Sequence, residues 1–439
     1  MSRLIDAGAP PTSPTSSRLG AAFFILLALT PNIPYIKLPG IGLALNDFPP
    51  ILAVICGMLA VAARYRRGET LPVTPVALLT GQIALIAAAS AVANGLVPND
   101  FLAGPTRWIE TTLIIGLAFI LGTDRELRSM FLRVAVVAAA VNALFGLGAW
   151  IVRWEGPYYL GIQNFERYQV LYGVFPGRIT GTLGIPSNGS GALFALMLPI
   201  AAGYALGAKD RASRWRWLAV TALFAVALVL TFSRVPLVLG VVSVVVLLAI
   251  RLKPSVALTA AVAFVVIVLA SPLRDRFAGD DNDRLRLWAT AVNMTRDNLF
   301  FGVGPDQYFD ALPEYAVTRF GVANNTAHNS VLEAAATLGI FAGILLTVAI
   351  ICSLAWLPTA ARLSRSRPEV FAAWLGLFGF VIASFTINYF FWPQLGILYW
   401  ALAMALSRWT PSAVTEPDRV AAPTEVPVEV RRGLTASRR

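Results

Sequence analysis

Long apolar runs recur along the whole chain, and they decide what it can fold into. Several reach the roughly 20 residues that a helix needs to cross a bilayer, and the basic residues are spread among short segments between them. Hydrophobic residues make up 57% of the 439 residues and charged residues 13%, whereas soluble domains hold about 25% charged residues. The chain is therefore expected to be an all-α integral membrane protein with many spans.

Hydropathy divides the apolar part of the chain into about twelve predicted transmembrane helices. Two of the outer connections are long, at residues 153–185 and 272–328, and the larger one lies between the ninth and tenth helices. The predicted helices cover residues 19–37, 47–63, 74–95, 106–122, 129–152, 186–207, 215–233, 235–251, 255–271, 329–357, 370–390 and 393–408.

The distribution of basic residues predicts which side of the membrane each connection faces. When the N-terminus is placed in the cytoplasm, most of the 35 Lys and Arg residues fall on inner segments, as the positive-inside rule requires. Residues 1–18 then form a cytoplasmic segment, residues 19–408 the membrane domain, and residues 409–439 a disordered cytoplasmic tail. The net charge of +11 thus indicates membrane orientation and not a nucleic-acid partner.

The first outer loop is rich in aromatic residues and ends in glycines around Arg178. Aromatic rings can stack on sugars, but an interfacial aromatic belt gives the same pattern without a ligand. Glycine at 177, 181 and 184 lets the backbone approach a bound molecule closely. This segment is therefore a candidate binding region.

Arg234 stands alone in the turn between two very apolar helices. An arginine there can extend to lipid phosphate at the membrane surface. It can also face inward and bind a substrate phosphate through two parallel hydrogen bonds. The residue type and position allow both interpretations.

The second outer loop contains Arg284 and Arg286 on a predicted helix that runs to about Asp297, with Asp283 as its N-cap. The acidic run before this helix lacks the loop length and the downstream glutamate of an EF-hand, so it does not predict a metal site. Further along, Gly302 and its neighbours predict a glycine turn, for which phosphate binding is a weak possibility. The two cysteines lie inside apolar runs and indicate packing rather than metal binding.

His328 is the only histidine of the chain, and it ends the second outer loop where a long apolar run begins. A histidine there can simply cap the helix or bond a backbone carbonyl. It can also act as a general base, because its ordinary pKa lies near neutrality and the positive end of a helix favours the neutral imidazole. Glu333 is five residues away, so helical spacing does not imply a histidine–glutamate dyad.

Three stretches of this half of the chain, in this order, resemble the O-antigen ligase and polymerase superfamily. They are residues 284–288 (RLRLW), residues 302–304 (GVG), and residues 327–333 (AHNSVLE) followed by 338–343 (LGIFAG). The segments 178–188 and 233–234 are similar to upstream landmarks of the same family. The resemblance covers about residues 178–345 together with the twelve-helix layout.

The resemblance implies an inverting, metal-independent glycosyltransferase that needs no cofactor. It takes a glycan from undecaprenyl diphosphate at the periplasmic face of the bacterial inner membrane. It implies that His328 is catalytic and that Arg234 and one of Arg284 or Arg286 bind diphosphate, with Arg178 as a further candidate. The two arginines point to different faces of a helix, and Arg284 is the preferred one.

Several functions share this pattern. A ligase transfers the glycan to lipid A-core, a polymerase transfers it to another lipid-linked repeat, and a related enzyme transfers it to protein. A transporter of lipid-linked glycans is a different class, and it usually needs ionisable residues at mid-membrane. Acidic residues here lie near helix ends, and Arg107 and Glu110 are spaced to pair at the outer interface. We therefore favour an enzyme of the outer face over a transporter.

Overall fold

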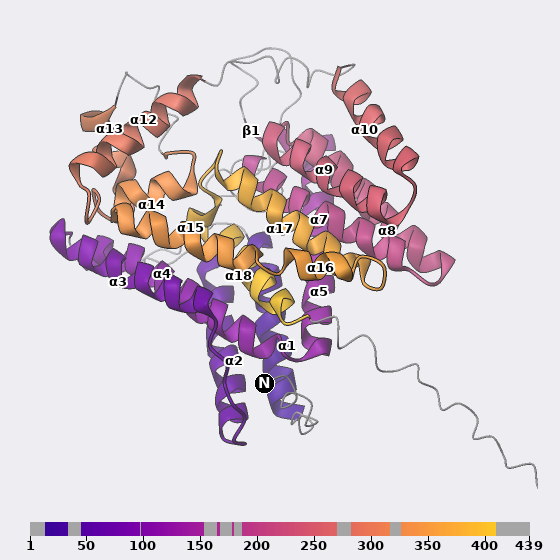
Figure 1. Ribbon diagram of the computed structural model, residues 1–439, viewed down its shortest axis with the longest axis horizontal. Coiled ribbons are helices and arrows are strands. Elements are labelled where there is room, and N and C mark those ends of the chain that lie inside the picture. The colour runs from indigo at the N-terminus through magenta and orange to yellow at the C-terminus, as the bar shows by residue number, and fades with distance from the viewer. Residues whose placement is uncertain are drawn as a thin grey trace, which may run out of the picture.

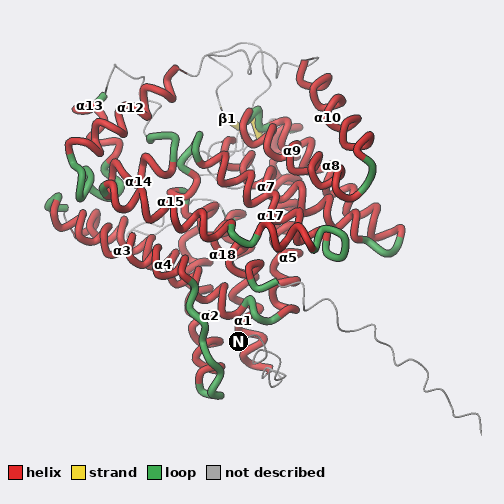
Figure 2. The backbone as a smooth tube through the Cα atoms, viewed as in Figure 1, coloured by secondary structure: helices red, strands yellow, loops and turns green. Residues whose placement is uncertain are grey.

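The computed structural model describes residues 14–33, 45–96, 98–152, 165–166, 178–179, 187–269, 282–316 and 326–409. In these ranges the chain is helical apart from turns and one small antiparallel pair, β1 (Phe165–Glu166) and β2 (Arg178–Ile179). Figures 1 and 2 show the arrangement of the elements. The predicted tail, the run 279–281 and most of the first outer loop lie outside the described residues.

Each predicted apolar span other than residues 329–357 overlaps one α-helix of the described ranges, with different bounds at several ends, and further helices lie between the spans. The helices are α1 (Pro14–Leu29), α2 (Phe48–Tyr65), α3 (Pro75–Ala93), α4 (Pro98–Leu121), α5 (Arg125–Ile151), α7 (Ser187–Gly207), α8 (Arg211–Leu230), α9 (Arg234–Arg251), α10 (Pro254–Leu269), α12 (Asn282–Asp297), α13 (Tyr308–Tyr315), α14 (Ser330–Leu338), α15 (Ile340–Leu354), α16 (Leu357–Arg362), α17 (Pro368–Ser384) and α18 (Pro393–Ser407), with 3-10 turns η1 (Thr30–Asn32), η2 (Leu45–Asp47) and η4 (Tyr389–Phe391).

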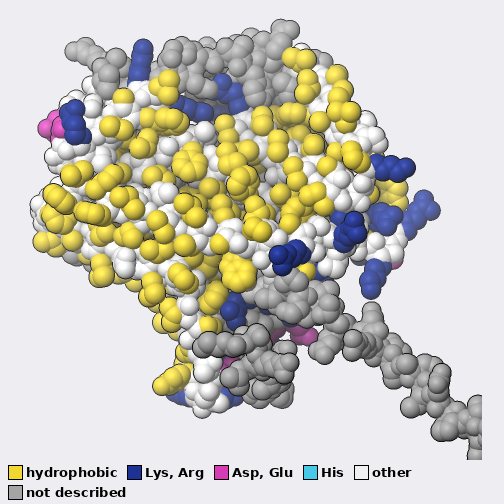
Figure 3. All heavy atoms as spheres, viewed as in Figure 1, with side chains coloured by type: hydrophobic (Ala, Val, Ile, Leu, Met, Phe, Trp, Pro, Cys, Tyr) yellow, Lys and Arg dark blue, Asp and Glu magenta, His cyan; other side chains and the backbone are white. Residues whose placement is uncertain are grey.

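Seven helical segments of the described chain are long and apolar enough to cross a bilayer, and three shorter apolar helices accompany them. Large apolar side chains such as Leu59, Leu85 and Val141 lie exposed along these helices. Figure 3 shows that hydrophobic side chains cover most of the visible face, while lysine and arginine gather toward its edges. This is the surface of a multi-pass membrane protein.

The centre of the protein is formed by α7, α17 and α18, whose residues are mostly buried. Helix α17 packs against α7 and α9, and α18 packs against α4 and α15. Gly376 on α17 lets the backbones of α17 and α7 approach, because a Cβ there would lie 2.5 Å from the carbonyl oxygen of Leu196. Small residues at such crossings are typical of packed membrane helices.

The tenth predicted helix, residues 329–357, is wrong as one continuous span. The chain breaks at Gly339, which adopts a φ of 97° between α14 and α15. A Cβ at this position would collide with the carbonyl of Phe300, so glycine is what allows the break. The apolar segment Ile340–Arg362 remains long enough to cross a bilayer by itself.

Three helices beyond the apolar spans build a small second core. Helices α12, α13 and α14 and the turn before α14 bury Leu287, Met294, Tyr308, Ala327 and Ala336 together. The hydroxyl of Tyr308 donates to the carbonyl of Leu287 at 3.1 Å. Because Ala327 belongs to this core, the residue after it, His328, has a defined place.

Two smaller expectations are also corrected. Helix α12 begins at Asn282, so Asp283 lies in its first turn and does not precede it as an N-cap. Arg107 forms its ion pair with Asp306 at 3.2 Å, not with Glu110. The second difference arises because the loop that holds Asp306 packs over the N-terminal part of α4.

Candidate active site

Arg178 holds together three segments that are far apart in the sequence. Its Nε donates to the carbonyl of Thr231 at 2.7 Å, and one terminal nitrogen donates to Asn188 Oδ1 at 2.8 Å and to Ser233 Oγ at 3.1 Å. The side chain is buried. Strand β2 is therefore fixed to the start of α7 and to the turn that precedes Arg234.

Arg234 is the first residue of α9, immediately after this turn. Its side chain is half-buried. The turn has an unusual backbone, because Phe232 adopts a φ of 50°. The hydrogen bonds of Arg178 and the backbone conformation of Phe232 thus fix the position of Arg234 at the start of α9.

Tyr389 connects this region with the turn between α17 and α18. Its hydroxyl donates to the carbonyl of Asn188 at 3.0 Å. Burial raises the pKa of Tyr389, while the charges of Arg284 and Arg178 lower it. Two arginines from different segments of the chain therefore act electrostatically on one buried phenol.

The structure distinguishes the two arginines of α12. Arg284 is half-buried and Arg286 is exposed. Arg284 is also the charged residue whose field acts on His328. Of the two, it is Arg284 that shares an electrostatic environment with His328.

His328 lies just before α14 in a strained conformation, with a φ of 51°. It does not cap this helix, because the cap is Asn329, whose Oδ1 accepts from the backbone of Val331 and Leu332 at 3.0 and 3.1 Å. The Nδ1 atom of His328 is buried and has no hydrogen-bond partner among the described residues. The interpretation of His328 as a structural cap is therefore wrong.

Burial lowers the pKa of His328 to about 4, and the charge of Arg284 lowers it further in the same direction. The imidazole is accordingly neutral at pH 7. The sequence predicted a neutral histidine from the helix N-terminus, whereas loss of hydration is the largest cause here. A neutral imidazole with a nitrogen that has no hydrogen-bond partner in the described chain can accept a proton.

Glu333 is the residue of this region whose role the sequence did not reveal. Its Oε2 accepts from the backbone N–H of Ala327 at 2.7 Å, and its Oε1 accepts from Asn388 Nδ2 at 3.1 Å. The carboxyl group contacts the backbone before His328, not its ring. Glu333 thus ties the histidine turn to the segment that follows α17.

The glycine turn predicted at Gly302 exists, but its N–H groups are engaged. Val303 and Gly304 donate to the carbonyls of Ala336 and Thr337 at 2.9 and 3.0 Å. These carbonyls belong to the last turn of α14, where helices leave acceptors unsatisfied. The turn therefore caps α14, and these two amides are not available to bind phosphate.

One comparison with known proteins bears directly on this region. Residues 218–347 match the family model described as O-antigen ligase. The chain carries an O-antigen ligase domain. The family includes ligases and polymerases, which transfer lipid-linked glycans in the bacterial inner membrane. No curated protein matches the chain.

The O-antigen ligase domain covers just under a third of the chain and includes four of the five predicted site residues. These four are Arg234, Arg284, Arg286 and His328. Arg178 precedes the matched segment, although its hydrogen bonds join it to Thr231 and Ser233 inside it. The structure thus adds to the domain a residue that the family model does not cover.

Three loop residues of the O-antigen ligase domain have strained backbone conformations. Among the described residues other than glycine, positive φ values occur at Phe232, Asp306 and His328. All three lie inside the matched segment. His328 is itself a predicted site residue, and Phe232 lies two residues before Arg234. Such conformations cost of order 1–3 kcal/mol each and persist where the surroundings enforce them.

The described part of this domain offers little to a metal ion. No group of three or more His, Cys, Asp or Glu side chains gathers in the described ranges. The acidic run that was compared with a calcium loop lies mostly outside them. The positively charged groups of the candidate site are arginines.

Proposed function

We propose that this protein transfers a glycan from undecaprenyl diphosphate to an acceptor hydroxyl at the periplasmic face of the inner membrane. The transfer is inverting and needs neither metal nor cofactor. The chain crosses the membrane about twelve times, with both termini in the cytoplasm. The observation that carries the proposal is that neutral His328 and Arg284 share one environment inside an O-antigen ligase domain.

In the proposed reaction His328 accepts the proton of the attacking hydroxyl. The hydroxyl oxygen forms a bond to the anomeric carbon of the donor sugar, and the bond from that carbon to the diphosphate breaks. The electron pair of the broken bond leaves with undecaprenyl diphosphate. A base beside the nucleophile and cations beside the leaving group are what this displacement requires.

Arg234 and Arg284 bind the diphosphate in this proposal. Guanidinium groups suit it because they offer parallel donors to phosphate oxygens and remain charged. Arg178 orders the turn that carries Arg234, and diphosphate contact by Arg178 or Arg286 stays a prediction. The bound diphosphate would also offset the charge of Arg284 and so raise the basicity of His328.

The test is glycan transfer in membranes that contain the His328→Ala variant. We expect transfer to be abolished while the protein accumulates normally. Arg234→Lys is expected to be poor as well, since one ammonium cannot replace a two-point contact. Full activity of His328→Ala would end the general-base proposal, and full activity of Arg234→Lys would assign Arg234 to lipid contact.

A ligase and a repeat-unit polymerase both fit these residues. Deletion of the gene distinguishes them by the glycan that accumulates on undecaprenyl diphosphate. Long chains that never reach lipid A-core indicate a ligase, whereas single unpolymerised repeats indicate a polymerase. We place the ligase first.

A further inference from the structure

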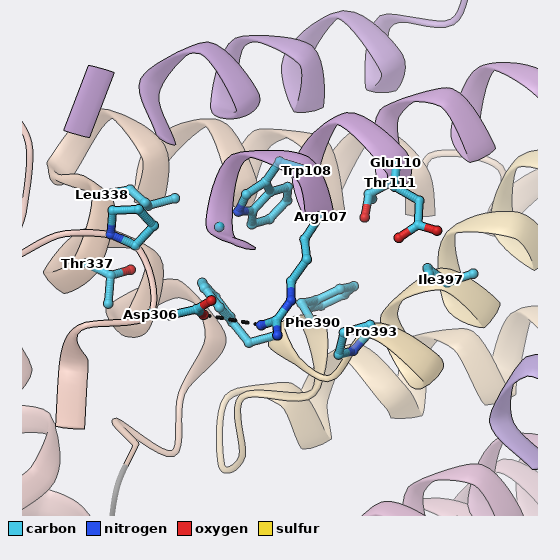
Figure 4. A pocket seen from close by; sticks show the side chains of 13 residues that line it. Arg107, Trp108, Glu110, Thr111, Asp306, Thr337, Leu338, Phe390, Pro393 and Ile397 are labelled. Carbon is cyan, nitrogen blue, oxygen red and sulfur yellow. Dashed lines mark hydrogen bonds and ion pairs between the residues drawn. The ribbon is translucent and has the colours of Figure 1, made fainter. Parts of the chain in front are cut away.

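A pocket at the outer end of α4 takes no part in the reaction as proposed above. It lies between α4, the Pro305–Asp306 turn, the end of α14 and the start of α18 (Figure 4). Its lining therefore brings together side chains from four segments of the chain.

The wall of the pocket is mainly aromatic and aliphatic. Trp108, Phe390, Phe391 and Ile397 line it, and the rings of Trp108 and Phe391 meet edge to face at 6.0 Å. Rigid aromatic walls of this kind suit a ligand that has an apolar face. Sugar rings present such a face through their C–H groups.

One polar group in the wall lacks a partner. The Oε1 atom of Glu110 is buried and accepts no hydrogen bond within the described chain. Arg107, one turn away, extends instead toward Asp306, which it meets at 3.2 Å (Figure 4). A buried carboxylate oxygen without a donor is costly, so a ligand that donates a hydrogen bond would be stabilised here.

Two carboxyl groups and one guanidinium line the pocket, and the guanidinium, that of Arg107, is paired with Asp306, so the lining does not favour a diphosphate. Glu110 lines it directly, and the charge of Asp47 acts on Glu110. Hydroxyl groups donate to carboxylates, whereas phosphate oxygens are repelled by them. The arginines assigned to the donor diphosphate do not line this pocket.

The pocket and His328 lie at opposite ends of one short helix. Thr337 and Leu338, at the end of α14, line the pocket, and His328 precedes the start of the same helix. Nine residues of α-helix extend over about 13 Å. Phe390 joins the two ends, because it lines the pocket while its N–H donates to Ser330 at 3.4 Å.

We propose that this pocket binds the acceptor glycan, at sugars remote from the hydroxyl that reacts. Glu110 accepts hydrogen bonds from sugar hydroxyls, and Trp108 and Phe390 contact a ring. The distance along α14 means that the acceptor is an oligosaccharide and not a single sugar. The identification of the ligand as the acceptor glycan rests on the proposed function. The expected contacts with hydroxyl groups and a ring rest on the residues of the pocket alone.

The test is direct binding, measured apart from transfer. The probe is the oligosaccharide released by mild acid from the glycolipid fraction of a gene-deletion strain, added to the purified full chain in nanodiscs. We expect Glu110→Leu, which keeps the volume of the side chain but accepts no hydrogen bond, to weaken binding at least tenfold. Glu110→Gln retains an acceptor and should lose less. Glu126→Leu, at an exposed position at the other end of the protein, is the matched control.

A second measurement separates this inference from the proposed function. Transfer from lipid-linked donor is followed while the amounts of acceptor and donor are varied in turn. Glu110→Leu should raise the acceptor amount needed for half-maximal rate and leave the donor amount unchanged. Equal binding of the probe by wild type and Glu110→Leu, or no binding by wild type, overturns the pocket assignment. Binding that depends on Glu110 without any transfer upholds the pocket and overturns the proposed function.

Discussion

The carboxyl group of Glu333 accepts a hydrogen bond from the backbone N–H of Ala327 at 2.7 Å, and Ala327 immediately precedes His328. A buried side chain thus fixes the backbone from which the candidate base extends. The left-handed conformation of His328 needs such support, because the strain is otherwise relieved by a local rearrangement. We therefore interpret Glu333 as a positioning residue.

Replacement of Glu333 should affect catalysis through His328. Glu333→Leu leaves the Ala327 N–H unpaired, at a cost of about 1–3 kcal/mol, and we expect kcat for glycan transfer to fall at least tenfold. KM for the donor should change little, since the arginines remain in place. Steady-state kinetics on purified protein check this, and a purely structural role would instead lower the amount of folded protein.

The conservative variant Glu333→Gln should retain most of the activity. Burial raises the pKa of Glu333 to about 8, although the hydrogen bonds from Ala327 and Asn388 lower it. The group is therefore largely protonated at pH 7, and glutamine has the same charge. Its amide oxygen can accept from Ala327. If the Asn388 amide turns over, the glutamine N–H can donate to Asn388 Oδ1, which has no partner in the described chain. An inactive Glu333→Gln would mean that the negative charge itself is needed.

The pH dependence of transfer should respond to Arg284. Activity requires neutral His328, whose pKa is lowered to about 4 by burial and then by Arg284, so kcat/KM of the wild type should stay level from pH 8 down to about pH 5. Arg284→Gln removes a charge that lowers this pKa. The pKa then rises, more imidazole is protonated at a given pH, and the acidic limb moves to higher pH. Arg286→Gln, at an exposed position on the same helix, should leave the acidic limb of the pH profile at the same pH.

Elements of this fold that depend on one local residue pattern could be predicted from the sequence. The apolar run at residues 186–207 predicted α7 to within one residue of Ser187–Gly207. The apolar side of the α12 segment predicted a helix that ends at Asp297. Hydrophobic burial along a single helix is a local property, and it can be read without knowledge of the partners.

Features that depend on contacts between distant segments could not be predicted in this way. Glycine is common in membrane helices, so nothing local showed that Gly339 breaks one by packing against Phe300. Glu333 lies five residues after His328, and helical spacing excluded a ring contact without revealing the bond to Ala327. Arg107 was matched to its helical neighbour because Asp306, its actual partner, is far away in the sequence.

Arg178 should contribute to stability as well as to activity. Arg178→Gln removes hydrogen bonds to Thr231, Asn188 and Ser233, and bonds from charged donors contribute about 1.5–3 kcal/mol each. We expect a lower melting temperature of the purified protein and a loss of transfer, because the turn before Arg234 is released. Arg66→Gln, an exposed arginine, is the control. An unchanged melting temperature for Arg178→Gln would contradict the role of Arg178 as a link between these segments.

Gly339 should tolerate no side chain. Gly339→Ala places a Cβ against the carbonyl of Phe300 and requires an L-residue at a φ of 97°, so both effects oppose the break between α14 and α15. The turn that follows α12 also depends on this approach, because Ile340 donates to the carbonyl of Leu299 at 2.9 Å. We expect Gly339→Ala to accumulate poorly in membranes, as measured by immunoblot at equal expression.

Gly148→Ala, in the helical part of α5 with open space around it, should accumulate like the wild type, since alanine favours a helix over glycine by about 1 kcal/mol. Normal accumulation of Gly339→Ala would show that α14 and α15 can join into one helix.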